Sequence, residues 1–329
     1  MTNNNYPLVS VVIACYNCEK YVEMAVQSII DQTYKNLEIL ITDDCSTDNS
    51  FNLLKQLTEK DSRILLFKND ENLKLAKSLN NMIAVAKGKY IARMDADDIS
   101  LPERIEKQVT WMEANPDYVI CGTNAWYINE SGRKFRTSHL PCTNEEISKA
   151  KYIKCPFLHP SVIIKSDIAK VNKYDEEYFA AQDYNLWFSI LEVHKGYNLK
   201  EKLLLYRDHS ESVTNKKKDG SHRLLVNIFS EYLTNYNYSL SEKYVYGFLT
   251  GKKIDDTDLN VLILGLFNQI KSCDGFNFYI LLRCFKFYFN NKKTGAFMHN
   301  LSVKEKFKFF AKLVFFFFNY IFAFFKKNI

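Results

Sequence analysis

Glycine and proline are scarce in this chain, with 10 glycines and 6 prolines among 329 residues. This scarcity excludes the collagen-like and proline-rich classes of protein. No GxGxxG follows the first apolar segment and no GxxxxGK[ST] occurs anywhere, so the two usual backbone cradles for a phosphate group are missing. A diphosphate ligand would need another partner, and a divalent metal held by carboxylate oxygens is the natural one.

The N-terminus also lacks a targeting signal. Residues 1–6 are short and polar, without the basic-then-apolar pattern of a signal peptide, so we expect a cytoplasmic chain. The eight cysteines are scattered and need not pair in a reducing compartment. Cys15 and Cys18 have the spacing of a redox motif, but no second close pair completes a zinc site, and ordinary thiols are the favoured interpretation. The formal net charge is a modest +6, and no nucleic-acid partner is expected.

Strand and helix patterns alternate over the first hundred residues. The segment 7–17, PLVSVVIACYN, has a continuous apolar core rich in Val and Ile, which is typical of a parallel strand buried on both faces. The expected strands are 7–17, 37–44, 63–69 and 89–98, and the expected helices are 19–33, 51–61 and 75–88. This order predicts an α/β domain with a mainly parallel sheet flanked by helices.

The pattern changes further along the chain. Between 103 and 215 it predicts helices at 103–116 and 182–196 and strands within 117–129, 161–171 and 203–214. After NKKKDG at 215–220 the sequence becomes helical, aromatic and poor in motifs. We therefore expect an α/β domain over 1–215, a helical region over 216–303 and an amphipathic aromatic helix over 304–329.

Polar residues gather at the carboxyl ends of the four expected strands. These clusters are Tyr16-Asn17, Asp43-Asp44, Asn69-Asp70 and the stretch Asp95 to Asp98. In open parallel sheets ligands bind along that edge. Three carboxylates within four residues, at 95, 97 and 98, repel one another, so the sequence predicts a positive partner there, with a divalent cation the natural candidate.

The motif set resembles the family 2 glycosyltransferases with the GT-A fold, over roughly residues 7–215. The matching stretches are VSVVIACYN, DDCSTDNS, ENLKLAKSLN, YIARMDADDISLPERI, HPSVI, QDYNLW and YRDHSESVT. The resemblance implies a Rossmann-like sheet and a hexosyl- or N-acetylhexosaminyltransferase. It is nearest to bacterial enzymes that extend lipopolysaccharide or capsule glycans. It also implies a UDP-sugar donor, a lipid-linked or oligosaccharide acceptor, and Mn²⁺ or Mg²⁺ as cofactor.

The resemblance assigns roles to matching positions. Ala14 and Tyr16 would line the nucleotide pocket with the Tyr16 ring against the uracil, and Asp44, with Asp43, would accept hydrogen bonds from the base. The remaining assignments are Lys77 near the diphosphate, Asp95 and Asp97 as the DxD motif with Asp97 nearest the metal, Asp183 as catalytic base, His209 at the metal or diphosphate, and His159 at the acceptor.

Three positions depart from the family pattern. Cys45 replaces the usual Gly of DDGS, Lys74 stands where NxGL would have Gly, and Gln182 replaces a frequent Glu before the base. The first two affect the backbone, because Gly reaches positive φ easily and Cys or Lys does not. None removes a group that performs the chemistry.

The chemistry of sugar transfer explains why such residues are needed. A metal neutralises the charge that develops on the leaving diphosphate. A carboxylate takes the proton from the attacking hydroxyl, and one base without a covalent nucleophile implies inversion at the anomeric carbon. Two rival functions stay open at this point. One is a nucleotidyltransferase, although ACYNCEKY lacks its Gly- and Lys/Arg-rich loop, and the other is a non-catalytic nucleotide-sugar-binding protein.

Several of the assigned residues also have a purely structural interpretation. Asp43 or Asp44 could cap the helix that follows, Asp97 could be a turn residue, and Asp183 could stabilise a helix start. His159 could only shape a turn before Pro160. Tyr16 could be a core aromatic.

The segment 304–329, KEKFKFFAKLVFFFFNYIFAFFKKNI, is almost all aromatic and aliphatic between Lys312 and Lys326. The uncharged run is shorter than the roughly 20 residues needed to span a bilayer. Flanking lysines favour a helix that lies in the interface of an anionic membrane. The alternative is a helix packed on the body or on a second subunit. The first interpretation predicts a peripheral protein on the cytoplasmic face of the inner membrane.

Overall fold

The computed structural model describes residues 6–151, 154–177 and 181–209. These residues belong to the first of two units into which the chain divides, residues 1–225. The expected helical region over 216–303 and the expected helix over 304–329 lie outside the described residues. Within the described ranges, no helix combines the length and the apolar character needed to cross a membrane.

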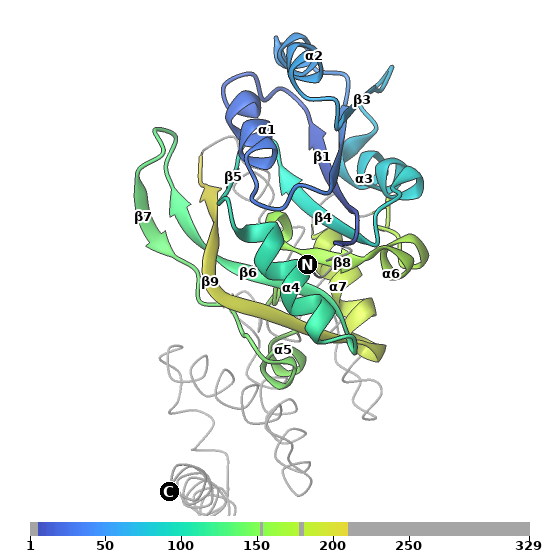
Figure 1. The fold of residues 1–329 in the computed structure, drawn as a ribbon, viewed down its shortest axis with the longest axis vertical. Coiled ribbons are helices and arrows are strands. Elements are labelled where there is room, and N and C mark those ends of the chain that lie inside the picture. Colours follow the sequence, from blue (N-terminus) through green and yellow to red (C-terminus); the bar gives the residue numbers. More distant parts are fainter. Residues whose placement is uncertain (1–5, 152–153, 178–180, 210–329) are drawn as a thin grey trace, which may run out of the picture. The chain divides into compact units, whose positions relative to one another are not determined.

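The described chain alternates strands and helices in its first part, as the sequence predicts (Figure 1). The strands are β1 (Val9–Cys15), β2 (Leu37–Asp43), β3 (Ile64–Lys68), β4 (Tyr90–Asp95), β5 (Ile99–Ser100), β6 (Tyr118–Ile128), β7 (Lys134–Thr137), β8 (Ile163–Lys165) and β9 (Lys195–Arg207). The helices are α1 (Val22–Ile30), α2 (Ser50–Lys60), α3 (Lys74–Val85), α4 (Arg104–Ala114), α5 (Asn144–Ala150), α6 (Ser166–Val171) and α7 (Gln182–Val193), with a 3₁₀ turn at His159–Ser161.

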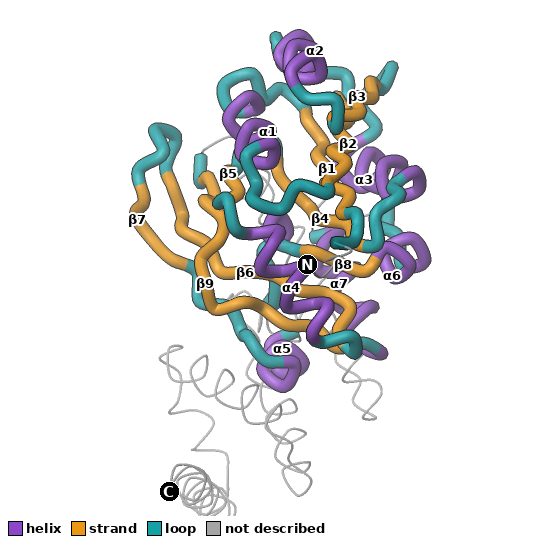
Figure 2. Tube along the Cα trace, viewed as in Figure 1, coloured by secondary structure: helices purple, strands orange, loops and turns teal. Residues whose placement is uncertain are grey.

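Two apolar clusters cover the two faces of the sheet. Successive side chains of a strand point to opposite faces, so Val11 and Ile13 of β1 join one cluster and Val12 joins the other. The first cluster includes buried residues of α1, α2 and α4. The second includes buried residues of α3, α5, α6 and α7. The result is a sheet between two helical layers, and Figure 2 shows the helices distributed around the strands.

The sheet order is β3-β2-β1-β4-β8-β6-β9-β5, with β7 paired to β6. The strands β3, β2, β1 and β4 are parallel, as the βαβ pattern predicts. The second half is mixed, because β8 runs antiparallel to both β4 and β6, while β9 runs parallel to β6. This α/β sheet flanked by helices is the architecture expected from the sequence, with more antiparallel pairing in its second half.

Strand register brings distant polar residues together at one edge. Ala14 at the end of β1 pairs with Asp95 at the end of β4. Its neighbour Cys15 pairs with Asp43 at the end of β2. On the far side of the acidic turn, β5 pairs with the last part of β9, with Ile99 opposite Leu205. The turn at 95–98 is therefore held between the parallel strands and the end of β9.

The two positions that lack the family's glycine have left-handed backbone. Cys45 has φ of 64° and Lys74 has φ of 72°. The loops therefore keep a conformation that glycine adopts freely, although an L-residue pays roughly 1–2 kcal/mol for it. Lys74 keeps its place because its backbone N–H donates to Asp44 Oδ2 at 2.9 Å and to Asn72 Oδ1 at 3.1 Å.

This strain gives a stability prediction for Lys74→Gly. The substitution keeps the N–H donor and removes the strain, but it adds about 0.5–1 kcal/mol of unfolded-chain entropy. The free energy of unfolding should rise by roughly 0.5–1 kcal/mol, measured by urea denaturation. Lys77→Gly, inside the same helix, is the matched control and should lower it by about 1 kcal/mol. If both variants lose stability equally, the left-handed backbone at Lys74 carries no strain.

Candidate functional site

Tyr16 and Asn17 form the first wall of the site, directly after β1. The Tyr16 side chain is 46% exposed, which rules out the core-aromatic interpretation. Asn17 joins two loops, because its Oδ1 accepts from the Thr47 N–H at 2.8 Å and its N–H donates to Ser46 Oγ at 3.0 Å. The next residue in this loop is Cys18, and its backbone N–H donates to Ser50 Oγ at 2.8 Å. The loops after β1 and β2 are thus fixed to each other beneath an exposed aromatic ring.

Cys15, behind this loop, lacks the low pKa of a reactive thiol. Cys15 and Cys18 are both free thiols. A hydrogen bond with Cys18, together with burial, raises the pKa of the Cys15 thiol. A reactive cysteine needs a lowered pKa, so Cys15 belongs to the core of the sheet.

Asp43 and Asp44 are both buried, but they differ in their partners. Asp44 Oδ1 accepts from Asn69 Nδ2 at 2.7 Å and from the Leu73 N–H at 2.8 Å, and its Oδ2 accepts from the Lys74 N–H. Asp44 therefore caps the start of α3. The sequence suggested a cap for the helix that follows Asp44 directly, which is α2. Asp43 Oδ2 accepts from the Ser46 N–H at 3.2 Å, while its buried Oδ1 has no hydrogen-bond partner. Asp43 thus keeps one buried carboxylate oxygen that no described residue satisfies.

The acidic turn after β4 concentrates charge in a small volume. Asp95, Asp97 and Asp98 each place a carboxylate oxygen within 4.8 Å of the others. Asp95 forms an ion pair with Arg93, a side chain that is only 3% exposed. Burial raises the pKa of Asp95, while the Arg93 charge acts in the opposite direction. The protein itself thus supplies one of the positive partners that the sequence requires.

The other two carboxylates have different partners, both on the end of β9. Asp98 is 1% exposed, and its Oδ1 accepts from the Arg207 N–H at 2.7 Å. Burial, together with the neighbouring carboxylates, raises the pKa of Asp98 well above its ordinary value. Asp97 Oδ2 lies 2.9 Å from His209 Nε2, and this contact raises the pKa of His209. The structure therefore brings together Asp97 and His209, which are 112 residues apart in sequence.

This donor set fits a hard divalent cation. Carboxylate oxygens suit both Mn²⁺ and Mg²⁺, while the imidazole nitrogen is a better ligand for Mn²⁺ than for Mg²⁺. Asp98 Oδ2 is buried and has no hydrogen-bond partner, so the turn holds an acceptor that no described residue satisfies. Of the predicted ligands, Asp95 also forms an ion pair with Arg93, while Asp97 and His209 contact each other.

Asp183 lies in the first turn of α7, half-buried. It is not the N-cap, since that position is Ala181 and no side chain caps the helix. Burial raises the pKa of the Asp183 carboxyl, and the charges of Arg93 and Asp95 are near enough to act on it. The Cys155 thiol donates a weak hydrogen bond to Asp183 Oδ2 at 3.9 Å. A carboxylate with a raised pKa, within electrostatic range of the acidic turn, has the properties of a general base.

Two further predicted residues differ in their surroundings. His159 is half-buried and its Nε2 lies 2.7 Å from the Tyr174 hydroxyl. Burial, with the Arg93 charge, lowers the pKa of His159 well below its ordinary value, so the ring is neutral near pH 7. Lys77 is exposed on α3. Neither residue shares a contact with the acidic turn in the described part of the chain.

Sequence reasoning missed the arginines that organise this site. Arg93 lies within the stretch ARMDADD, and its place two residues before Asp95 on the same strand was a usable signal. Arg104 is fully buried, and its Nη1 donates to the carbonyls of Arg93 and Pro160. Burial lowers the pKa of Arg104 to about 9. Arg207 precedes His209 by two residues, but its contacts with the acidic turn and with the carbonyls of Asn129 and Glu130 cannot be predicted from the sequence.

Comparisons with known proteins agree with this geometry. The sequence model of Glycosyl transferase family 2 matches residues 10–169. An uncharacterized glycosyltransferase of Methanocaldococcus jannaschii is 37% identical over 204 residues, covering 60% of this chain and 70% of that protein. A second relative, from Escherichia coli, is named UDP-Glc:alpha-D-GlcNAc-diphosphoundecaprenol beta-1,3-glucosyltransferase. It is 34% identical over 214 residues, covering 64% of this chain and 81% of the relative.

The chain belongs to glycosyltransferase family 2. The protein is therefore a glycosyltransferase, and the nucleotidyltransferase and non-catalytic alternatives are set aside.

Solved structures show the same fold. Residues 1–349 of Staphylococcus aureus TarS, solved with UDP-GlcNAc, match with a TM-score of 0.57 at 16% identity, covering 91% of this chain and 77% of that one. The mannosyltransferase PcManGT of Pyrobaculum calidifontis, solved with GDP-Man and Mn²⁺, matches with a TM-score of 0.56 at 14% identity, covering 88% and 89%. This family 2 transferase thus has the GT-A fold that its motifs imply.

Proposed function

We propose that this glycosyltransferase is an inverting, metal-dependent enzyme that moves a sugar from a UDP-sugar to a hydroxyl group of a surface glycan. The observation that carries the proposal is that Asp183, on α7, lies within electrostatic range of the residues at the end of β4, because the charges of Arg93 and Asp95 act on its pKa. A transferase needs a metal or cation site and a base on opposite sides of one sugar carbon. A further relative from Escherichia coli is named an O-antigen biosynthesis glycosyltransferase, and the glucosyltransferase compared above is named for a diphosphoundecaprenol-linked acceptor, which supports a surface polysaccharide as the product.

The nucleotide would bind at the ends of β1 and β2. The exposed Tyr16 ring would offer a surface on which a uracil stacks, and Ala14, at the end of β1 opposite Asp95, would line the same pocket. Asp43 Oδ1 is the buried acceptor without a partner, and it would receive the uracil N–H. Asp44 would support binding of the base together with Asp43, and it holds the start of α3 beside the pocket through the Leu73 and Lys74 N–H groups. Lys77, exposed on that helix, would reach the diphosphate.

The cation would be Mn²⁺ or Mg²⁺, held by Asp97, Asp95 and His209, and it would neutralise the charge of the leaving diphosphate. His209 would hold the cation through a ring nitrogen that carries no proton. Arg93 offsets the charge of Asp95, so the turn stays folded before a cation binds.

The acceptor hydroxyl would lose its proton to Asp183. The raised pKa of this carboxyl makes it a stronger base than an exposed aspartate, and one base without a nucleophile implies inversion. His159 would contact the acceptor through a neutral ring that is held by Tyr174. Purified protein supplied with Mn²⁺ and single UDP-sugars should release UDP with one preferred donor. The absence of UDP release with every donor, with and without acceptor glycans, would remove the proposed donor class.

Asp97→Asn tests the metal. An amide keeps the shape of the side chain but removes the charge that faces the cation, so UDP release should fall by about 10²-fold or more. Excess EDTA should inactivate the wild type, and Mn²⁺ should restore it but not the variant. Asp117→Asn, at an exposed aspartate paired with Lys195, is the control and should keep full activity. Undiminished wild-type activity in EDTA would exclude metal dependence.

Asp183→Asn tests the base. Turnover should fall by ~10²–10⁴ while UDP affinity stays within about twofold, because the carboxylate acts only in the transition state. The control is Asp167→Asn, an exposed aspartate that also lies in a first helical turn and should leave turnover unchanged. A parallel loss of UDP affinity would assign Asp183 to structure, and a product with retained anomeric configuration by NMR would reject the single-base mechanism.

The pH dependence follows from the same group. Only the ionised carboxylate accepts a proton, so kcat/KM should fall as the pH decreases through the pKa of Asp183. Burial raises that pKa above 3.8, so the loss begins at a higher pH than for an exposed aspartate. The acid limb should disappear from the residual activity of Asp183→Asn.

The segment 304–329 would hold the enzyme against the cytoplasmic face of the membrane. The basis is its sequence, an aromatic run bracketed by Lys304, Lys306, Lys308, Lys312, Lys326 and Lys327. Each lysine would add up to roughly 1 kcal/mol at an anionic surface. Truncation after Asn300 should move the protein from the membrane to the soluble fraction while activity on a short, water-soluble acceptor is kept. A truncated protein that still pellets with membranes would place the contact elsewhere.

A further inference from the structure

Arg207, at the end of β9, makes contacts with three separate segments although it is only 3% exposed. Its backbone N–H donates to Asp98 Oδ1 and its Nε donates to the Asp97 carbonyl, both at 2.7 Å. Both contacts lie in the acidic turn. One residue thus holds the two carboxylate positions 97 and 98 through their side chain and their backbone.

The other end of the guanidinium reaches the turn between β6 and β7. Arg207 Nη1 donates to the carbonyl of Asn129 at 3.1 Å and to that of Glu130 at 3.0 Å. The next residue strengthens this attachment, because the Asp208 N–H donates to the Ile128 carbonyl at 2.9 Å. The β6–β7 turn and the acidic turn are therefore bonded to the same side chain.

The third contact is with the start of α1. The Arg207 guanidinium lies 4.5 Å from the Tyr21 ring centroid, and its Nη2 lies 3.8 Å from Met24 Sδ. The Tyr21 ring in turn lies 5.6 Å from the His209 ring. The Tyr21 ring thus packs against both the Arg207 guanidinium and the His209 ring that contacts Asp97.

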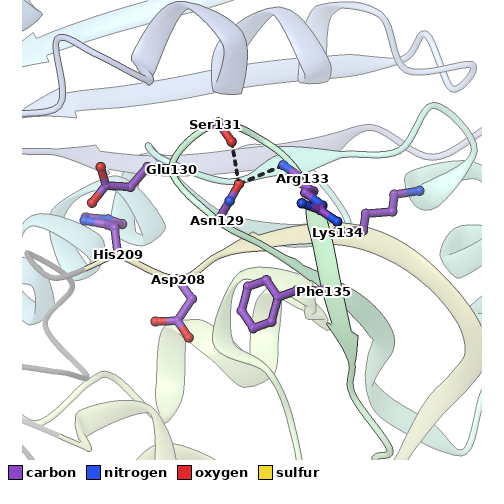
Figure 3. Close-up of a pocket in the computed structure, with 8 residues that line it drawn as sticks. All are labelled: Asn129, Glu130, Ser131, Arg133, Lys134, Phe135, Asp208 and His209. Atoms are coloured by element: carbon purple, nitrogen blue, oxygen red, sulfur yellow. Dashed lines mark hydrogen bonds between the residues drawn. The ribbon is translucent and has the colours of Figure 1, made fainter.

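A cavity of about 1040 Å³ lies beside this contact network. Its lining comes from the β6–β7 turn and the end of β9, and Figure 3 shows His209 and Glu130 close together on one side of it with Phe135 and Asp208 below. His209 belongs both to this cavity and to the acidic site, because its Nε2 lies 2.9 Å from Asp97. The position of the β6–β7 turn therefore sets one wall of the cavity and, through Arg207, the position of the acidic turn.

We propose that Arg207 is a positioning residue that locks the acidic turn 95–98 to the β6–β7 turn and so fixes Asp97 and His209 for the cation. The proposal rests on the metal-dependent function proposed above. Arginine suits the task because its planar fork offers several donors in fixed directions, which match carbonyls on different segments. The three donors of lysine lie on one nitrogen atom, so a lysine at this position cannot span the carbonyls of both turns.

The test uses the full chain with Arg207→Met and Arg207→Lys, and Arg136→Met as matched control. Arg136 is exposed on β7 and stacks on Tyr127, without contact to the acidic turn. Amide hydrogen exchange is measured without metal or nucleotide. Both Arg207 variants should exchange faster over 95–100 and over 128–134, and the control should exchange like the wild type at 95–100. Unchanged exchange in either segment for both Arg207 variants overturns the proposal.

The second readout is UDP affinity by calorimetry, in Mn²⁺ and in EDTA. In Arg207→Met, the increase in UDP affinity that Mn²⁺ produces should be about tenfold smaller than in the wild type. Arg207→Lys should lose less. Affinity in EDTA should stay within twofold, which a general loss of folding would not allow. An equal loss in EDTA and in Mn²⁺ contradicts the positioning role. If Arg207→Met does not fold, Arg207→Lys is judged by the same criteria. If Mn²⁺ adds nothing to wild-type affinity, the metal-dependent function fails and the exchange data alone decide whether Arg207 joins the two turns.

Discussion

Repulsion among three carboxylates at the end of β4 is the constraint on which the site depends. With ligand oxygens within 4.8 Å of one another, each charged pair costs on the order of 3 kcal/mol at an effective dielectric constant of about 20. That exceeds what a surface ion pair returns, roughly 0.2–1 kcal/mol. The surroundings compensate each carboxylate differently, with an ion pair from Arg93, a backbone N–H from Arg207 and a contact with His209.

These partners are far apart in sequence, and the sheet brings them together. Parallel register aligns the ends of β1, β2 and β4, while β9 passes from β6 to β5 and delivers its last residues to the acidic turn. The base comes from a third place, the start of α7. Because no single loop contains the site, its geometry depends on the mixed half of the sheet as much as on the parallel half.

Much of this arrangement could be predicted from sequence. The βαβ alternation and the polar strand ends predict the parallel sheet and its binding edge, because side-chain period and burial are local signals. The motif resemblance correctly predicted the family and the GT-A fold. The structure also brings Asp97 into contact with His209, while the roles assigned to the site residues stay predictions.

Other features depend on tertiary contacts that no local pattern reveals. Asp44 caps α3 rather than the helix after it, because β3 lies beside β2 and carries the start of α3 to that carboxylate. The left-handed backbone at Cys45 and Lys74 persists without glycine, since the surrounding bonds determine the loops. The contacts of Arg207 with the acidic turn and the β6–β7 turn depend on the position at which β9 ends. The sequence predicts a cation as the positive partner of the carboxylates at 95–98. In the fold, the buried Arg93 supplies part of that positive charge.

The central claim is that the end of β4 and the end of β9 together form one cation site. The most direct measurement is anomalous X-ray diffraction from crystals of the protein grown with UDP and Mn²⁺. The account predicts a single strong manganese peak in coordination contact with Asp97 and His209, beside a diphosphate whose uracil lies on Tyr16. A well-ordered UDP with no manganese peak at Asp97, or with the peak away from both residues, would contradict it.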